Sequence, residues 1–130
     1  MAAGIEIRPA HFPGRAPIDA YGNGGFRFAD MSHRGSLLCL PSGIHGWAVN
    51  EPSQLSIEHF SQIIAQASEI EFLLVGMGDT MRMIPKELRA ALKDAGISVD
   101  PMSTGAAVRT YNIMLSESRA VAAALIAVEG

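Results

Sequence analysis

A short apolar run at residues 72–75, Phe-Leu-Leu-Val, has no polar face and ends at Gly76 and Gly78. It predicts a central strand covered on both sides, as in the parallel sheets of α/β domains. An amphipathic helix is expected next, because Pro85 suits a first helical position and Gly96 a left-handed end. A short strand at residues 97–99, ended by Asp100 and Pro101, would complete a parallel strand-helix-strand unit.

Two further helices are predicted by apolar residues at helical spacing. One follows Ser56 and continues to residue 67, and the other begins at a Thr104 cap. The first half of the chain favours β structure. We expect a weak edge strand at residues 5–8, a glycine-rich turn at 18–25 before a strand at 26–28, and a hairpin of 36–40 with 45–49 that places Trp47 on its inner face. Residues 119–128 remain ambiguous, because their alanines favour a helix while their β-branched residues favour a strand.

Composition and charge narrow the class of protein. With 130 residues, of which 48% are apolar, the chain suits a single domain over residues 1–130. A net charge of -3 without a basic cluster argues against nucleic-acid binding. The lone Cys39 lies in an apolar run and predicts a buried, inert thiol in a reducing compartment. No apolar run approaches a membrane span and no signal peptide is recognisable, so we expect a cytoplasmic protein without membrane insertion.

Motifs for catalysis, metals or cofactors are weak or absent. The four histidines lack the spacing of a metal site, and no Gly-x-Ser-x-Gly elbow occurs. Gly76-Met77-Gly78 resembles the opening of a dinucleotide fingerprint, but Met81 replaces its third glycine. The two glycines more simply allow a sharp turn at a strand end. We therefore predict no cofactor, no metal and no catalytic residues, and regard an enzyme as the less favoured reading.

One edge of the predicted sheet is nevertheless a candidate ligand site. The strands ending near residues 75 and 99 would meet there, and helices beginning near residues 85 and 104 would direct free backbone amides toward it. Arg109 and Asn112 either line this crevice or bond the backbone at the rim of the domain, and the second reading is slightly preferred. The candidate ligand-binding residues are Gly76, Gly78, Arg82, Thr104, Arg109 and Asn112.

Several segments together resemble a known family. They are residues 18–27 (Ile-Asp-Ala-Tyr-Gly-Asn-Gly-Gly-Phe-Arg), 35–38 with Pro41 and Trp47, 74–78, and 104–112 (Thr-Gly-Ala-Ala-Val-Arg-Thr-Tyr-Asn) with Glu117 and Arg119. In this order they are similar to the small α/β domain family that contains the mitochondrial complex I assembly factor, and they span nearly the whole chain. The segment Ala-x-Arg-Thr-Tyr-Asn is the most specific of them.

The resemblance implies a fold: a three-layer α/β domain of β/β/α type, with a mixed central sheet, three helices, an N-terminal β-rich layer, and a last strand antiparallel to the others. It also implies that residues 121–128 form that strand. No catalytic residues carry over. This chain shows no mitochondrial targeting segment, so the resemblance suggests a bacterial-type cytoplasmic relative.

Two classes of function follow. The first is a non-enzymatic, chaperone-like interaction protein for a respiratory NADH:ubiquinone oxidoreductase, with an exposed patch around Phe26 or Trp47. The second is a small-molecule binder or enzyme that uses the Gly76–Gly78 crevice with Arg82 and Arg109 as anion contacts. An exposed sheet edge further suggests a homodimer.

Overall fold

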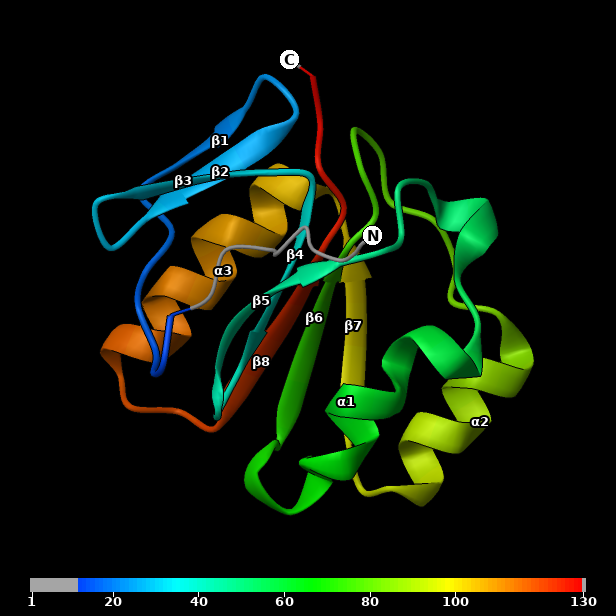
Figure 1. The fold of residues 1–130 in the computed structure, drawn as a ribbon. Coiled ribbons are helices and arrows are strands. Elements are labelled where there is room, and N and C mark those ends of the chain that lie inside the picture. The colour runs from blue at the N-terminus through cyan, green and yellow to red at the C-terminus, as the bar shows by residue number, and fades with distance from the viewer. Residues whose placement is uncertain (1–11, 130) are drawn as a thin grey trace, which may run out of the picture.

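The computed structural model describes residues 12–129, which form two sheets and three helices (Figure 1). The small sheet is antiparallel, in the order β1 (Ala20–Gly22), β2 (Gly25–Phe28), β3 (Met31–Arg34). The large sheet has the order β5 (Gly43–Trp47), β4 (Ser36–Leu40), β8 (Val121–Leu125), β6 (Phe72–Gly76), β7 (Ser98–Met102). The helices are α1 (Ser61–Ala65), α2 (Lys86–Asp94) and α3 (Thr104–Ser116), with short 3-10 turns η1 (Pro52–Gln54), η2 (Ile57–Phe60) and η3 (Ala67–Glu69).

Both faces of the large sheet are covered. Successive side chains of a strand point to opposite faces, so Leu73 and Val75 pack with α1 and α2 while Leu74 packs with α3 and the small sheet. Figure 1 shows α3 and the small sheet on one side of the large sheet and α1 with α2 on the other. The predicted three-layer α/β class with a mixed sheet, three helices and an N-terminal β-rich layer is confirmed.

The orientation predicted for the last strand is wrong. β8 runs parallel to β6, which is itself parallel to β7, and only its other neighbour, β4, is antiparallel to it. The reason lies in the connection, because α3 carries the chain from the end of β7 back to the start of β8, and a helical crossover of this kind joins parallel strands. Parallel pairing inserts β8 at the centre of the sheet, where Ala122, Ala123 and Ala124 are fully buried.

Most of the other predicted elements are present with shifted limits. The 36–40 strand, the left-handed Gly96 (φ 83°) and the strand in the tail are confirmed. The hairpin partner predicted at 45–49 is present at Gly43–Trp47, and the helix predicted to begin at Pro85 is present at Lys86–Asp94, with Pro85 as its cap. The predicted helix from residue 56 to 67 is instead split into η2, α1 and η3. The turn expected at 18–25 contains β1, and the strand predicted to end at Val99 continues through Pro101 to Met102. The edge strand predicted at residues 5–8 lies outside the described residues.

Pro101 protects the outer edge of the large sheet. The Ser98 amide donates to the Glu71 carbonyl and the Met102 carbonyl accepts from Met77, so Ser98, Asp100 and Met102 direct their backbone groups toward β6. Val99 and Pro101 then face outward. Because proline has no N–H, this edge offers fewer donors to an added strand, which is how natural sheets limit edge-to-edge pairing.

Candidate functional site

A pocket of 460 Å³ lies where the chain leaves β6 and where α3 begins. Its position agrees with the general rule that ligands of α/β sheets gather at the carboxyl ends of the strands. Seven residues line it: Tyr21, Gly78, Asp79, Ser103, Gly105, Arg109 and Val128. Two of these, Gly78 and Arg109, belong to the candidate ligand-binding residues predicted from the sequence.

The first turn of α3 is held by hydrogen bonds to two neighbouring segments. The Thr104 amide donates to the Gly78 carbonyl (2.8 Å), and the Thr104 hydroxyl donates to the Ile126 carbonyl (2.7 Å) and accepts from the Gly78 amide (3.0 Å). Thr104 is therefore not the helix cap, which corrects the sequence prediction. Ser103 is the cap, and its hydroxyl accepts from the Ala106 amide (3.3 Å).

Two glycines allow close packing around this helix end. A Cβ on Gly76 would lie 2.9 Å from Cα of Thr104 and 3.1 Å from Cδ2 of Leu125, so β6 approaches α3 only because residue 76 has no side chain. A Cβ on Gly105 would overlap the hydroxyl of Tyr21, which reaches over the helix from β1. The wall of the pocket is thus formed jointly by α3 and by Tyr21 of the small sheet.

The six predicted ligand-binding residues do not form one cluster. Gly76 is buried under Thr104, whose hydroxyl is fully engaged. Asn112 bonds the backbone of Ile18, accepting from its amide (2.8 Å) and donating to its carbonyl (2.9 Å). Arg82 is exposed on the loop after β6 and does not line the pocket.

The chemistry of the pocket is mixed. Arg109 supplies a guanidinium, and among the described residues the amide of Gly105 in the first turn of α3 has no acceptor. Both groups suit an anion. Asp79 lines the same pocket and adds a negative charge, so a ligand carrying both signs suits it better than a simple anion. Within residues 12–129 no three His, Cys, Asp or Glu side chains gather as a metal site.

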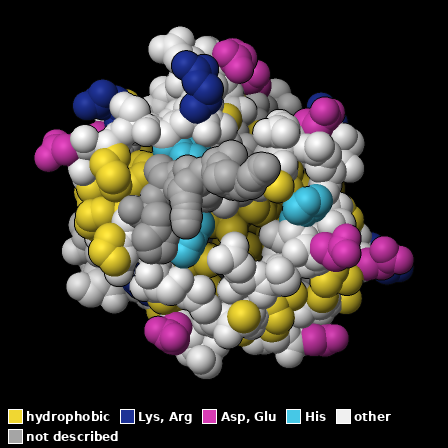
Figure 2. Space-filling model, viewed as in Figure 1, with side chains coloured by type: hydrophobic (Ala, Val, Ile, Leu, Met, Phe, Trp, Pro, Cys, Tyr) yellow, Lys and Arg dark blue, Asp and Glu magenta, His cyan; other side chains and the backbone are white. Residues whose placement is uncertain are grey.

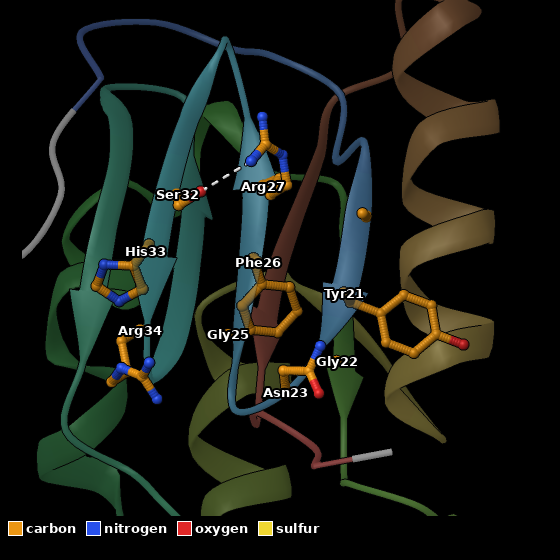
Figure 3. Close-up of a pocket in the computed structure, with 10 residues that line it drawn as sticks. Tyr21, Gly22, Asn23, Gly25, Phe26, Arg27, Ser32, His33 and Arg34 are labelled. Atoms are coloured by element: carbon orange, nitrogen blue, oxygen red, sulfur yellow. Dashed lines mark hydrogen bonds between the residues drawn. The ribbon is translucent and has the colours of Figure 1, made fainter.

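A second hollow, of 440 Å³, lies on the outward surface of the small sheet and was missed by the sequence predictions (Figure 3). Directly opposed residues of antiparallel strands share a face, and the core-facing Phe26 and Phe28 identify the other face as the outward one. The outward positions form two rows across the sheet, Ala20–Arg27–Ser32 and Gly22–Gly25–Arg34, which we call the arginine face. Neither β1 nor β3 was predicted, so this arrangement had no signal in the sequence.

His33 lies beside the arginine face, at the edge strand β3. Its Nε2 donates to the Ser36 carbonyl at 3.1 Å. Burial lowers the pKa of His33 below its ordinary value, and the hydrogen bond to Ser36 partly opposes this shift. The imidazole is therefore neutral at physiological pH, and the positive charge of this surface comes from Arg27 and Arg34.

The remaining surface shows where a partner could be contacted. The patch predicted around Phe26 or Trp47 is absent, because these side chains are only 3% and 8% exposed and belong to the core. Two of the exposed large apolar side chains, Met81 and Met83, lie together on the loop after β6 and are 55% and 71% exposed, while the others are Tyr21, Ile57 and Ile113 on separate elements. On the face seen in Figure 2, charged side chains are spread around the rim and form no basic stripe.

Three comparisons relate this chain to known proteins. The model of a family described as a protein of unknown function (DUF498/DUF598) matches residues 18–126. An uncharacterised protein of Rhodobacter capsulatus is 38% identical, over 95% of this chain and 94% of its own length. NADH dehydrogenase (ubiquinone) 1 alpha subcomplex assembly factor 3 of Mus musculus is 29% identical over 94% of this chain, and the chain spans 66% of the mouse protein.

A solved structure agrees with the fold. A crystal structure from Bartonella henselae, described as an outer membrane protein, is 58% identical to this chain and superposes with a TM-score of 0.88, over 91% of this chain and 99% of the other. In the part of the present chain that the structure describes, no helix has the length and apolar character to cross a membrane.

Proposed function

The chain belongs to the family of proteins of unknown function DUF498/DUF598, and we propose that it is a non-enzymatic interaction protein that assists the assembly of a respiratory NADH dehydrogenase complex. The observation that carries this proposal is the similarity to assembly factor 3, which extends over 94% of the chain. The similarity therefore covers the whole folded unit and not a single motif.

The exposed methionines support an interaction role. Met81 and Met83 lie two residues apart on the loop between β6 and α2, with Arg82 between them. Methionine is flexible and polarisable, and it is used at surfaces that adapt to a partner. Arginine is also enriched where proteins meet. We propose this loop as an apolar contact of the assembly role.

The test is an affinity capture from the cells in which the protein occurs. The tagged protein is incubated with solubilised membranes and with cytosol, and the bound proteins are identified by mass spectrometry. We expect enrichment of NADH dehydrogenase subunits, and a loss of that enrichment when Met81 and Met83 are both replaced by Asp. Lys93→Ala, on the exposed side of α2, is the matched control. Normal assembly of the complex in cells that lack the protein would contradict the proposal.

A second candidate function rests on the pocket at the start of α3. We propose that it holds a small charged ligand, with Arg109 and the Gly105 amide as anion contacts and Gly78 and Ser103 in the wall. The volume of 460 Å³ falls within the range of ligand pockets. Arg109→Ala is expected to abolish binding of any such ligand, while Arg82→Ala, outside the pocket, leaves it unchanged. Equal ligand affinity in the Arg109→Ala variant would exclude this site.

Location and oligomeric state complete the proposal. We propose that the protein acts on the cytoplasmic side of the membrane that carries the respiratory complex, and fractionation with an antibody against the native chain checks this. A homodimer is a further expectation. Because Pro101 interrupts the outward edge of β7, such a dimer would use another surface. Light scattering across a range of protein concentrations measures the oligomeric state.

A further inference from the structure

The hollow on the arginine face carries a positive charge that the described part of the chain does not neutralise. The only ion pair among residues 12–129 joins Arg119 to Glu117, on another part of the molecule. Arg27 donates from Nη1 to the Ser32 hydroxyl (3.2 Å), which leaves its other donors available. Arg34 has no described side-chain partner.

The two guanidinium groups can act together. Arg27 is opposite Ser32 and Arg34 is opposite Gly25, so the arginines are diagonal neighbours on one face, with Cβ atoms roughly 7 Å apart. Figure 3 shows them at opposite ends of the hollow. A polypeptide segment with two neighbouring acidic side chains can therefore bind both guanidinium groups. Guanidinium binds carboxylate in a fork geometry that lysine does not provide.

The row between the arginines carries no side chain at Gly22 or Gly25, because the hairpin requires glycine at both positions. A Cβ on Gly25 would overlap the carbonyl oxygen of His33, and Gly22 has a φ of 125°. In the row Gly22–Gly25–Arg34, Arg34 is therefore the only residue with a side chain. Gly25 is itself buried, so the contacts with a docked segment come from the arginine side chains and not from the backbone between them.

Acidic side chains of this chain would compete with a partner if they paired with Arg27 or Arg34. Asp19 precedes β1, Asp30 lies in the turn before β3, and the carboxylate of Glu129 lies over Gly24 at the hairpin tip. None of the three forms an ion pair with either arginine within the described residues. The charge of the arginine face is thus available to a partner.

The exposure of the hollow indicates the size of the occupant. Ala20, Arg27, Ser32 and Arg34 are all exposed. A small ligand would remain largely in water, whereas ligand sites bury most of the surface of what they bind. A polypeptide that continues beyond the hollow gains contacts on either side, and arginine and tyrosine are the residues that most often dominate such interfaces.

From this arrangement we propose that the arginine face is the docking surface for an acidic segment of a protein partner, whose carboxylates bind Arg27 and Arg34. The inference rests on the proposed assembly role and names the chemistry of the contact. Docking of this kind weakens as salt increases, because exposed charge pairs are screened.

The test compares capture of NADH dehydrogenase subunits by three proteins: the native chain, the double variant Arg27→Glu/Arg34→Glu, and Lys93→Glu, which carries a reversed charge on α2. Circular dichroism first establishes that all three are folded. We expect the double variant to capture at least about tenfold less than the native chain, and Lys93→Glu to capture normally. Replacing the contacting acidic residues of the captured subunit by lysine is then expected to restore capture by the double variant.

The outcomes separate this inference from the proposed function. If the native chain and the double variant capture the subunits equally, the arginine face is not the docking surface and the assembly role stands. If the native chain captures none, the assembly role and the inference both fail. Inorganic phosphate, titrated against the native chain and followed by amide chemical shifts, tests a small anion as the occupant. Saturable shifts of Arg27 and Arg34 at low millimolar phosphate would overturn the docking proposal.

Discussion

The hydroxyl of Thr104 donates a 2.7 Å hydrogen bond to the carbonyl oxygen of Ile126, so the first turn of α3 is tied to the segment that follows β8. The same hydroxyl accepts from the Gly78 amide at 3.0 Å. One fully buried side chain therefore joins three segments that are distant in the sequence.

Thr104→Val removes this hydroxyl and keeps the shape of the side chain. We expect a loss of about 2–6 kcal/mol in the free energy of unfolding, because the Ile126 carbonyl and the Gly78 amide both lose a partner at a cost of about 1–3 kcal/mol each. Thr104→Ser keeps the hydroxyl and should lose less. Urea denaturation followed through Trp47, the single tryptophan, measures both. Equal stability of the valine and serine variants would contradict the role given to the hydroxyl.

Gly76→Ala and Gly105→Ala make a matched pair of glycine substitutions. The alanine at 76 meets the backbone of Thr104 and should destabilise the fold by about 1–3 kcal/mol, the usual cost of overpacking. The alanine at 105 meets only the end of the Tyr21 side chain, which can rotate away, and the gain in helix propensity partly offsets the loss. Thermal unfolding of the two variants compares them. A larger loss of stability in Gly105→Ala than in Gly76→Ala would contradict this explanation.

Stability should fall at alkaline pH because Cys39 and Tyr111 are both buried in the same part of the core. Burial raises the pKa of Cys39 from 9.0 to about 12, and it also raises the pKa of Tyr111. Between pH 9 and 12 the unfolded chain loses the thiol proton while the folded chain keeps it, so unfolding becomes more favourable as pH rises. Each such group contributes a slope of about 1.4 kcal/mol per pH unit.

Cys39→Ala provides the control for this pH dependence. Urea unfolding at several pH values above 9 should show that the free energy of unfolding declines less steeply in this variant than in the native protein. The difference in slope should be that of one titrating group. The native thiol should also resist a disulfide reagent at pH 8 until the protein is unfolded, since a protonated, buried thiol is a poor nucleophile. Rapid modification of the folded protein would show that Cys39 is accessible.

Asn112→Ala should release the chain before β1 from α3. Both hydrogen bonds between Asn112 and the Ile18 backbone are lost, and we expect about 1–3 kcal/mol of destabilisation. Amide hydrogen exchange is expected to accelerate at Ile18 more than in β6. Thr110→Ala, on the same helix and partly exposed, is the comparison variant. Unchanged protection at Ile18 would show that other contacts hold this segment.

Several features of the fold could be predicted from the sequence alone. The run at residues 72–75 has no polar face, and burial on both faces follows from that pattern wherever the strand lies in the sheet. Pro85 and Gly96 marked the beginning and the end of α2 in the sequence, because their backbone preferences are intrinsic. Residues 104–115 likewise have an apolar helical face, and α3 spans 104–116.

Tertiary structure decided the features that depend on segments distant in the chain. The alanines of β8 favour a helix locally, and only burial between layers makes them a strand, while its parallel direction follows from the path of α3. The cap of α3 moved to Ser103 because the Thr104 hydroxyl is engaged by Ile126.

The candidate sites likewise depend partly on the sequence and partly on tertiary structure. Gly78 and Arg109 were predicted near one strand edge from the order of the elements, and both line the pocket there. Arg27 and Arg34 carry no motif, and they share a face only because of the register between β2 and β3. A residue's type and local spacing were available in the sequence, whereas which side chains oppose one another across strands is determined by pairing and packing of the whole fold.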